Sequence, residues 1–195
     1  MMTLCLLLAG CGGTSGGERD AAQMRVPYRD MTGCTMEAVV SCTQDGQAWE
    51  ATLRCDHAVE GKTTIEVLAP ETIQGVRAVL DGQTLRLEYE DLCLDAGTLS
   101  EEDISPMTCL PRMMSALRDG WLLEQNEEEW DGVSCLRITT DQSGTSGKIL
   151  STIWLRKDDG TPLRGEIAVD GEIILTAAFT DFSFYDTITE QVPAA

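Results

Sequence analysis

A seven-residue stretch, TLRLEYE (residues 84–90), gives the plainest indication of how this 195-residue chain folds. Leu85, Leu87 and Tyr89 alternate with three charged residues, so the apolar side chains would lie on one face of an extended strand and the charged ones on the other. This period of two predicts a β-strand with one buried face.

The same alternation recurs along the chain, in TTIEVLA (63–69), SCLRITT (134–140) and GEIAVDG (165–171). Dipeptides typical of tight turns separate the strands: Asp45-Gly46, Glu60-Gly61, Asp81-Gly82, Asp131-Gly132, Asp159-Gly160 and Asp170-Gly171. Many short strands joined by hairpins predict a mainly β (α+β) chain with an antiparallel sheet, and they argue against a parallel α/β sheet.

One segment has a different period. In ISPMTCLPRMMSALRDG (104–120), the apolar residues Leu110, Met113, Met114 and Leu117 fall at positions i, i+3, i+4 and i+7, which is one stripe of a helix. Prolines stand near its start and Gly120 at its end. We expect this helix to cover one face of a strongly curved sheet. Because a single short helix covers a wide sheet only in part, an apolar groove is predicted beside it.

The candidate groove residues come from the apolar faces of the predicted strands and helix: Leu85, Leu87, Tyr89, Met113, Met114, Leu117, Ile153 and Leu155. Unbranched methionine side chains adapt to irregular ligands. The alternative for each of these residues is ordinary packing between helix and sheet.

The amino-terminal stretch MMTLCLLLAGCGGTSGG combines a short apolar run with a cysteine and a glycine-rich tract. The run is far below the roughly 18 residues that span a bilayer, but it fits the core of a secretory signal. Leu8, Ala9, Gly10 and Cys11 resemble the lipobox of bacterial lipoproteins. That resemblance implies cleavage before Cys11 and diacylglyceryl modification of its sulfur. The alternative is a buried edge strand.

These features predict four segments. Residues 1–10 are a signal peptide, residues 11–32 a lipidated cysteine with a flexible tether, residues 33–186 the folded domain, and residues 187–195 a carboxy-terminal tail. We therefore expect an extracytoplasmic protein that is anchored to the cell membrane by lipid.

The chain is strongly acidic, with 33 Asp and Glu against 14 Lys and Arg and a net charge of −19. Phosphate backbones and anionic headgroups repel such a surface, which argues against a nucleic-acid partner. Contact with the bilayer must then come from acyl chains rather than from charge. We expect a monomer.

Six cysteines follow Cys11, and their spacing fits no zinc site. If Asp45-Gly46 is a two-residue hairpin turn, Gln44 faces Gln47 and Met36 faces Cys55. This register places Cys34 diagonally from Cys55, which makes that pair a candidate disulfide. The alternative is that the thiols are buried and reduced.

Nothing in the sequence predicts catalysis, a cofactor or a metal. His57 is the single histidine, and Cys55-Asp56-His57 lacks an orienting group and an oxyanion site. We interpret His57 as a structural residue at a strand end.

Three longer stretches resemble the lipoprotein-carrier-like fold of the outer-membrane lipoprotein carrier and receptor, LolA and LolB. They are residues 70–92, with a strand-terminating proline and an Asp-Gly hairpin, the helix of residues 104–117, and residues 152–184, which close on Phe-Thr-Asp-Phe-Ser-Phe. The resemblance implies an unclosed β-barrel, with a helix over its concave face, that receives acyl chains. We therefore expect a non-catalytic protein that binds a lipid or another amphiphile. The alternative is an envelope interaction or sensory module with a fully packed sheet and no ligand.

Overall fold

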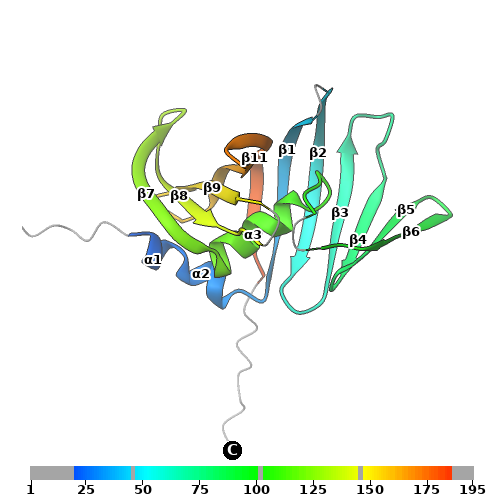
Figure 1. Cartoon of the computed structure of the whole chain (residues 1–195), viewed down its shortest axis with the longest axis horizontal. Coiled ribbons are helices and arrows are strands. Elements are labelled where there is room, and N and C mark those ends of the chain that lie inside the picture. Colours follow the sequence, from blue (N-terminus) through cyan, green and yellow to red (C-terminus); the bar gives the residue numbers. More distant parts are fainter. Residues whose placement is uncertain (1–19, 45–46, 101–102, 145–146, 186–195) are drawn as a thin grey trace, which may run out of the picture.

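The structure is a computed structural model that describes residues 20–44, 47–100, 103–144 and 147–185. Eleven strands form one sheet in the order β6-β5-β4-β3-β2-β1-β11-β10-β9-β8-β7, and every neighbouring pair is antiparallel. The order begins at β6 and ends at β7, and within the described residues these two edges do not pair. The predicted unclosed, curved antiparallel sheet is confirmed (Figure 1).

The sheet has two halves that meet where β1 pairs with β11. The first half contains β1 (Gly33–Gln44), β2 (Gln47–Ala58), β3 (Lys62–Ala69), β4 (Arg77–Asp81), β5 (Thr84–Tyr89) and β6 (Leu92–Thr98). The second half contains β7 (Trp121–Trp130), β8 (Val133–Asp141), β9 (Ile149–Arg156), β10 (Pro162–Val169) and β11 (Glu172–Phe184). Neighbours within each half follow one another along the chain, as in a meander.

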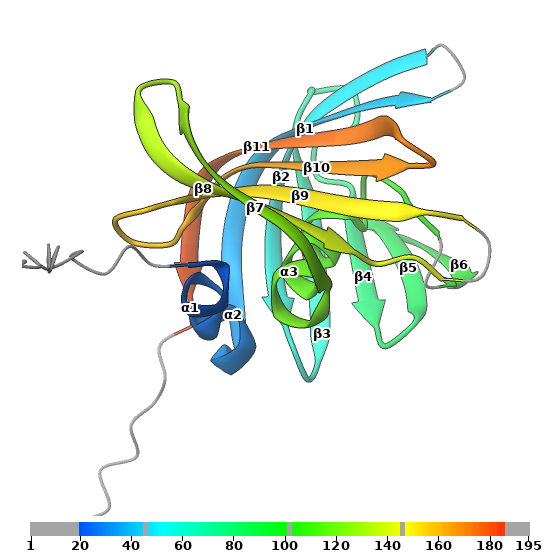
Figure 2. The ribbon, with the colours of Figure 1, turned by 60° about the vertical axis from the view of Figure 1, so that its left-hand side comes forward.

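Helix α3 (Cys109–Asp119) connects the two halves and lies over the concave face, as the sequence predicts (Figures 1 and 2). The predicted stripe of Leu110, Met113, Met114 and Leu117 is buried against the sheet. Pro111 lies in the first turn, where its missing N–H removes no helical hydrogen bond. Among the described residues, no helix is long and apolar enough to cross a membrane.

The register of the first hairpin follows the prediction from its turn sequence. Gln44 pairs with Gln47, and Met36 pairs with Cys55. Two other turns, Asp131-Gly132 and Asp170-Gly171, have positive φ at both residues, which is the conformation that two-residue hairpins prefer.

The amino-terminal part of the described chain differs from the prediction. Residues 20–32 were expected to belong to a flexible tether, but they contain α1 (Ala21–Met24) and α2 (Val26–Asp30). Tyr28 is completely buried, and its hydroxyl donates a hydrogen bond to the carbonyl of Gly160 at 2.7 Å. Its ring packs against Phe182 and Phe184 of β11. Residues 20–32 therefore belong to the folded body, because these buried contacts order the segment.

The candidate disulfide between Cys34 and Cys55 is not formed. Both thiols are buried and free, as Cys109 and Cys135 also are. Cys34 pairs with His57 across the hairpin, so Cys55 lies diagonally from it. Diagonal Cα atoms on adjacent strands are about 7–8 Å apart, whereas a disulfide needs about 4.4–6.8 Å. Of the alternatives drawn from the sequence, the structure has the buried, reduced thiols.

Candidate ligand-binding site

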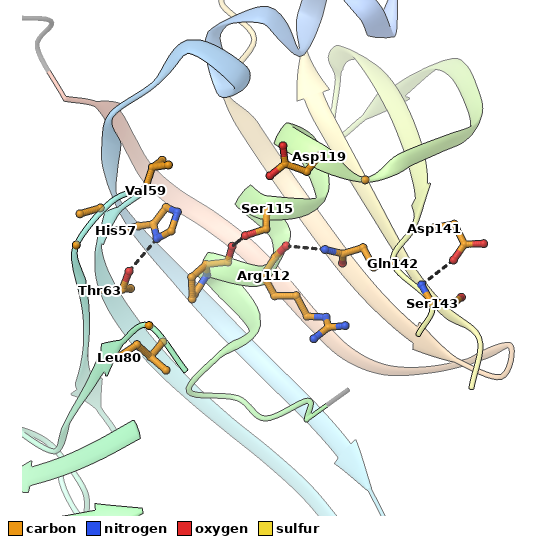
Figure 3. Close-up of a pocket in the computed structure, with 15 residues that line it drawn as sticks. His57, Val59, Thr63, Leu80, Arg112, Ser115, Asp119, Asp141, Gln142 and Ser143 are labelled. Carbon is orange, nitrogen blue, oxygen red and sulfur yellow. Dashed lines mark hydrogen bonds between the residues drawn. The ribbon is translucent and has the colours of Figure 1, made fainter. Parts of the chain in front are cut away.

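An open cavity of about 600 Å³ lies on the concave side of the sheet, next to the face of α3 that points away from the sheet (Figure 3). Three parts of the chain line it: the β2–β3 hairpin with the neighbouring β4, helix α3, and the end of β8 with the loop that follows. Their lining residues are His57, Ala58, Val59, Gly61, Thr63, Leu80, Gly82, Pro111, Arg112, Ser115, Asp119, Gly120, Asp141, Gln142 and Ser143.

Helix α3 supplies the floor of the cavity. Arg112, Ser115 and Asp119 recur at intervals of three and four residues, on the face opposite the buried stripe. The Ser115 hydroxyl donates to the carbonyl of Pro111 at 3.1 Å, which holds it against the helix. The side chain of Arg112 extends from α3 between the two walls of the cavity (Figure 3).

The wall formed by β2 and β3 contains His57 and Thr63. Their Nδ1 and Oγ1 atoms are 2.9 Å apart, which fixes the imidazole against the strand (Figure 3). Burial lowers the pKa of His57, and the charge of Arg118 lowers it further, while Asp56 acts in the opposite direction. The imidazole is therefore neutral at pH 7 and adds no charge to the cavity.

The opposite wall is the end of β8. The Gln142 side chain donates to the carbonyl of Arg112 at 3.3 Å and accepts a hydrogen bond from the Ser151 hydroxyl at 2.6 Å. Asp141 accepts a hydrogen bond from the backbone N–H of Ser143 at 2.8 Å. Hydrogen bonds from Ser143 lower the pKa of Asp141, so this carboxylate stays ionised. The Gln142 contact ties α3 to this half of the sheet.

A smaller cavity of about 160 Å³ lies at the amino-terminal end of α3 and shares Leu80, Gly82, Pro111 and Arg112 with the first. Leu99 adds to its apolar lining, and Gln83, Ser100, Asp103 and Thr108 are its other lining residues. The two cavities therefore combine a polar floor and walls with an apolar recess at one end.

None of the eight predicted groove residues lines the main cavity. Five of them are fully buried together between α3 and the sheet: Met113, Met114, Leu117, Ile153 and Leu155. Leu85 is buried in the same core, Leu87 is partly buried against it, and Tyr89 is exposed near the end of β5. The apolar layer that the sequence predicts is present, but α3 closes it.

The cavity uses the polar face of α3, which the sequence analysis did not assign. The helical period that identified Met113 and Met114 also places Arg112, Ser115 and Asp119 on the other side of the helix. The helical period was therefore the signal from which this polar face could have been identified in the sequence. His57, which the sequence analysis interpreted as a structural residue, contacts Thr63 near a strand end and also lines the cavity.

The polar side chains that line the cavity define what it offers a ligand. His57 and Thr63 contact each other through the imidazole and the hydroxyl. Within the described ranges, no group of three or more His, Cys, Asp or Glu residues could hold a metal ion. What the cavity offers a ligand is a cation at Arg112, carboxylates at Asp119 and Asp141, and the apolar recess.

No protein-family model matches the chain, and no curated protein matches its sequence. Solved structures are similar in fold. An uncharacterised conserved protein from Thermus thermophilus has a TM-score of 0.50 at 12% identity, over 85% of this chain and 88% of that chain. A LolA superfamily protein from Nitrosomonas europaea has a TM-score of 0.47 at 9% identity, over 85% and 92%. Lipoprotein LppX from Mycobacterium tuberculosis has a TM-score of 0.48 at 16% identity, over 83% and 92%. At these identities the similarity concerns the fold alone.

Proposed function

We propose that this protein is a non-catalytic, lipid-anchored extracytoplasmic lipoprotein that binds an amphiphile on its concave face. One observation supports this proposal above the others. The open cavity, with Arg112 on its floor, lies on one side of α3, and the methionine-lined apolar layer lies on the other. A single molecule with an anionic head and an alkyl chain has the chemistry to use both.

The head group would bind in the main cavity. Arg112 pairs with carboxylate or phosphate oxygens by charge-assisted hydrogen bonds, which are about twice as strong as neutral ones. The carboxylates of Asp119 and Asp141 disfavour a second negative charge, so the preferred head group carries one anionic centre beside hydroxyl or ammonium groups.

The alkyl chain would start in the recess formed by Leu80, Leu99 and Pro111. A longer chain needs α3 to move away from the sheet and to expose Met113 and Met114. Each buried CH₂ contributes about 0.8 kcal/mol, and methionine side chains repack readily around such a chain.

The anchor rests on the lipobox-like residues Leu8 to Cys11, which lie outside the described residues. Two acyl chains on Cys11 would hold the acidic body at the membrane against electrostatic repulsion. Labelling cells with a palmitate analogue tests this part. The wild type should be labelled and fractionate with membranes, and Cys11→Ala should do neither.

Ligand binding is tested separately, on the purified chain, with two probes: lysophosphatidylglycerol, which has an anionic head, and dodecyl maltoside, which is neutral. Replacing Arg112 by Gln should weaken lysophosphatidylglycerol binding about tenfold, or about 1.4 kcal/mol, and leave dodecyl maltoside binding nearly unchanged. Arg54→Gln is the matched control, because Arg54 pairs with Glu37 on an exposed part of β1 and β2. A wild type that binds neither probe would overturn the amphiphile proposal.

A second function is favoured by one specific observation, the complete burial of Met113, Met114 and Leu117 beneath α3. A protein that never opens this layer would act as an envelope interaction or sensory module. Native mass spectrometry separates the two proposals: co-purifying lipid supports the binding protein, and a lipid-free mass with no uptake of either probe supports the module.

A further inference from the structure

Four apolar side chains are exposed where α1, α2 and the start of β7 come together. Trp121 is 76% exposed, Leu123 47%, Leu122 37% and Val26 47%. Trp121 to Leu123 are consecutive at the free edge of the sheet. Exposed apolar side chains that gather in one region mark an interaction surface. We call these four residues the apolar corner.

Hydrogen bonds join the elements that carry the apolar corner. The guanidinium of Arg25, at the junction of α1 and α2, donates to the carbonyl of Gly120 at 2.7 Å. Val26 and Trp121 are the next residues along the chain from this contact. The N–H of Ala21 donates to the Gln125 side chain of β7 at 2.8 Å. Figure 1 shows α1 and α2 beside the end of β7 that adjoins α3. The apolar corner therefore lies on helices and a strand that are bonded to one another.

The edge of β7 is poorly suited to pairing with a strand of another protein. The register of β7 and β8 shifts between Leu122 and Glu124, so Leu123 has no partner on β8. Such a bulge blunts a sheet edge, and charged side chains such as Glu129 further along also disfavour pairing with another strand. A partner of this corner would therefore contact its exposed side chains rather than its backbone.

The charge around the apolar corner is smaller than that of the chain as a whole. Residues 20–31 and 116–124 contain three arginines, three aspartates and Glu124, and Asp141 pairs with Trp121 on β8, whereas the whole chain carries −19. An anionic membrane surface therefore repels this corner less than it repels the rest of the protein. Tryptophan is also the side chain that most favours the membrane–water interface.

The position of the proposed anchor points to the same surface. Eight residues lie between Cys11 and Asp20, the N-cap of α1, so nine Cα-to-Cα steps join the two. Fully extended, nine such steps span about 30 Å. An acylated Cys11 therefore keeps α1, and the apolar corner beside it, within that distance of the bilayer.

We propose that Val26, Trp121, Leu122 and Leu123 insert into the interface of the bilayer that carries the anchor, and that they set the orientation of the domain. This inference rests on the proposed lipid anchor. Its consequence concerns the ligand site: Asp119 and Gly120 line the cavity and directly precede Trp121. The cavity then lies close to the membrane surface, which gives an amphiphile a short path from the bilayer to Arg112.

The test uses the full lipidated chain in vesicles of phosphatidylethanolamine and phosphatidylglycerol, with brominated acyl chains as quenchers of tryptophan fluorescence. Flotation first reports whether the chain is anchored. Bromolipid should quench the wild type, and Trp121→Phe should reduce the quenching at least threefold. Leu123→Asp should also reduce it, because a charged side chain resists insertion. The matched control is Leu94→Asp, since Leu94 is 62% exposed on β6 at the opposite edge.

The outcomes separate the two proposals. Flotation with quenching that depends on Trp121 and Leu123, and not on Leu94, supports the membrane-contacting corner. Flotation with quenching that is equal in wild type and Trp121→Phe overturns it and leaves the anchor in place. A chain that does not float overturns the anchor, and this inference with it. Urea midpoints within the error of the wild type show that each variant is folded.

Discussion

The side chain of Met113 lies directly against Gly165, at a place where the sheet carries no side chain. A Cβ atom at Gly165 would overlap the sulfur of Met113 and crowd its methyl group. Because Gly165 belongs to β10 and Met113 to the buried face of α3, this glycine lets the helix approach the sheet closely. The contact joins α3 to β10.

Replacing Gly165 by Ala should therefore loosen α3. We expect a loss of about 1–3 kcal/mol in the free energy of unfolding, as overpacked cores show. If alkyl chains enter beneath α3, the same change should increase lysophosphatidylglycerol binding, because the helix is already displaced. Urea unfolding and a binding titration measure the two effects. Gly147→Ala is the control, since a Cβ there meets only Asp170 at ordinary contact distances. Equal stability of the two variants would contradict the close contact.

Arg25 joins the amino-terminal helices to the end of α3 by hydrogen bonds. It is 3% exposed, and its guanidinium donates to the carbonyls of Leu117, Ala116 and Gly120. These carbonyls are at the carboxy-terminal end of α3, where a cation also interacts favourably with the helix dipole.

Replacing Arg25 by Met should cost about 2–3 kcal/mol, because it removes hydrogen bonds from a charged donor and leaves buried carbonyls unpaired. Amide hydrogen exchange should quicken in the last turn of α3. Arg29→Met is the matched control: Arg29 is exposed on α2, and its replacement should change stability by less than about 0.5 kcal/mol. Similar losses of stability in both variants would show that the effect does not depend on the hydrogen bonds of Arg25 to α3.

Alternation predicted strands within β3, β5, β8 and β10, and the helical period predicted α3, but no local pattern predicted the segment that contains Arg25. Ala21, Met24 and Tyr28 have a helical spacing, yet Pro27 and the polar residues around them hide it. Burial of Tyr28 depends on β11, more than 150 residues further along the chain, and no local pattern contains that contact. The interpretation as a tether was wrong for residues 20–32 for this reason.

The candidate site shows the same limit. Alternation and helical period correctly indicated an apolar layer, including Met113 and Ile153, between helix and sheet. Whether such a layer is open or packed depends on how closely the helix approaches, and here Gly165 permits full closure. The cavity instead lies between walls at His57 and Gln142, which belong to different halves of the chain. The periodicity of one strand or helix does not specify how two such distant segments are placed.

The free thiols lead to a labelling prediction. Burial raises the pKa of both Cys34 and Cys109 to about 12 and that of Cys55 well above its ordinary value. Cys93 is exposed on β6. Because the thiolate is the reactive form, iodoacetamide at pH 8 should modify Cys93 quickly and the three buried thiols only slowly.

Peptide mass spectrometry after timed labelling measures these rates. In urea without reductant, Cys34 and Cys55 should become modified as readily as Cys93. If those two residues resist modification in urea until a reductant is added, a disulfide links them in the isolated protein. That result would contradict the arrangement of free thiols.

His57 should make the stability depend on pH. Its pKa in the folded protein is lowered, mainly by burial and then by Arg118, so the unfolded chain binds a proton more readily than the folded one. The imidazole therefore contributes its full stabilisation above the unfolded pKa of about 6.5, and this contribution is lost as the pH falls toward the folded pKa.

Wild-type stability should decrease between pH 7.5 and 5.5 relative to His57→Gln, which has no titrating group at this position. Urea unfolding of both proteins at three pH values gives the difference, from which the titration of the carboxylates cancels. Thr63→Val keeps the imidazole and removes its hydrogen-bond partner, so it should retain this pH dependence. A difference that stays constant, or that grows on acidification, would show that burial does not destabilise the charged imidazole.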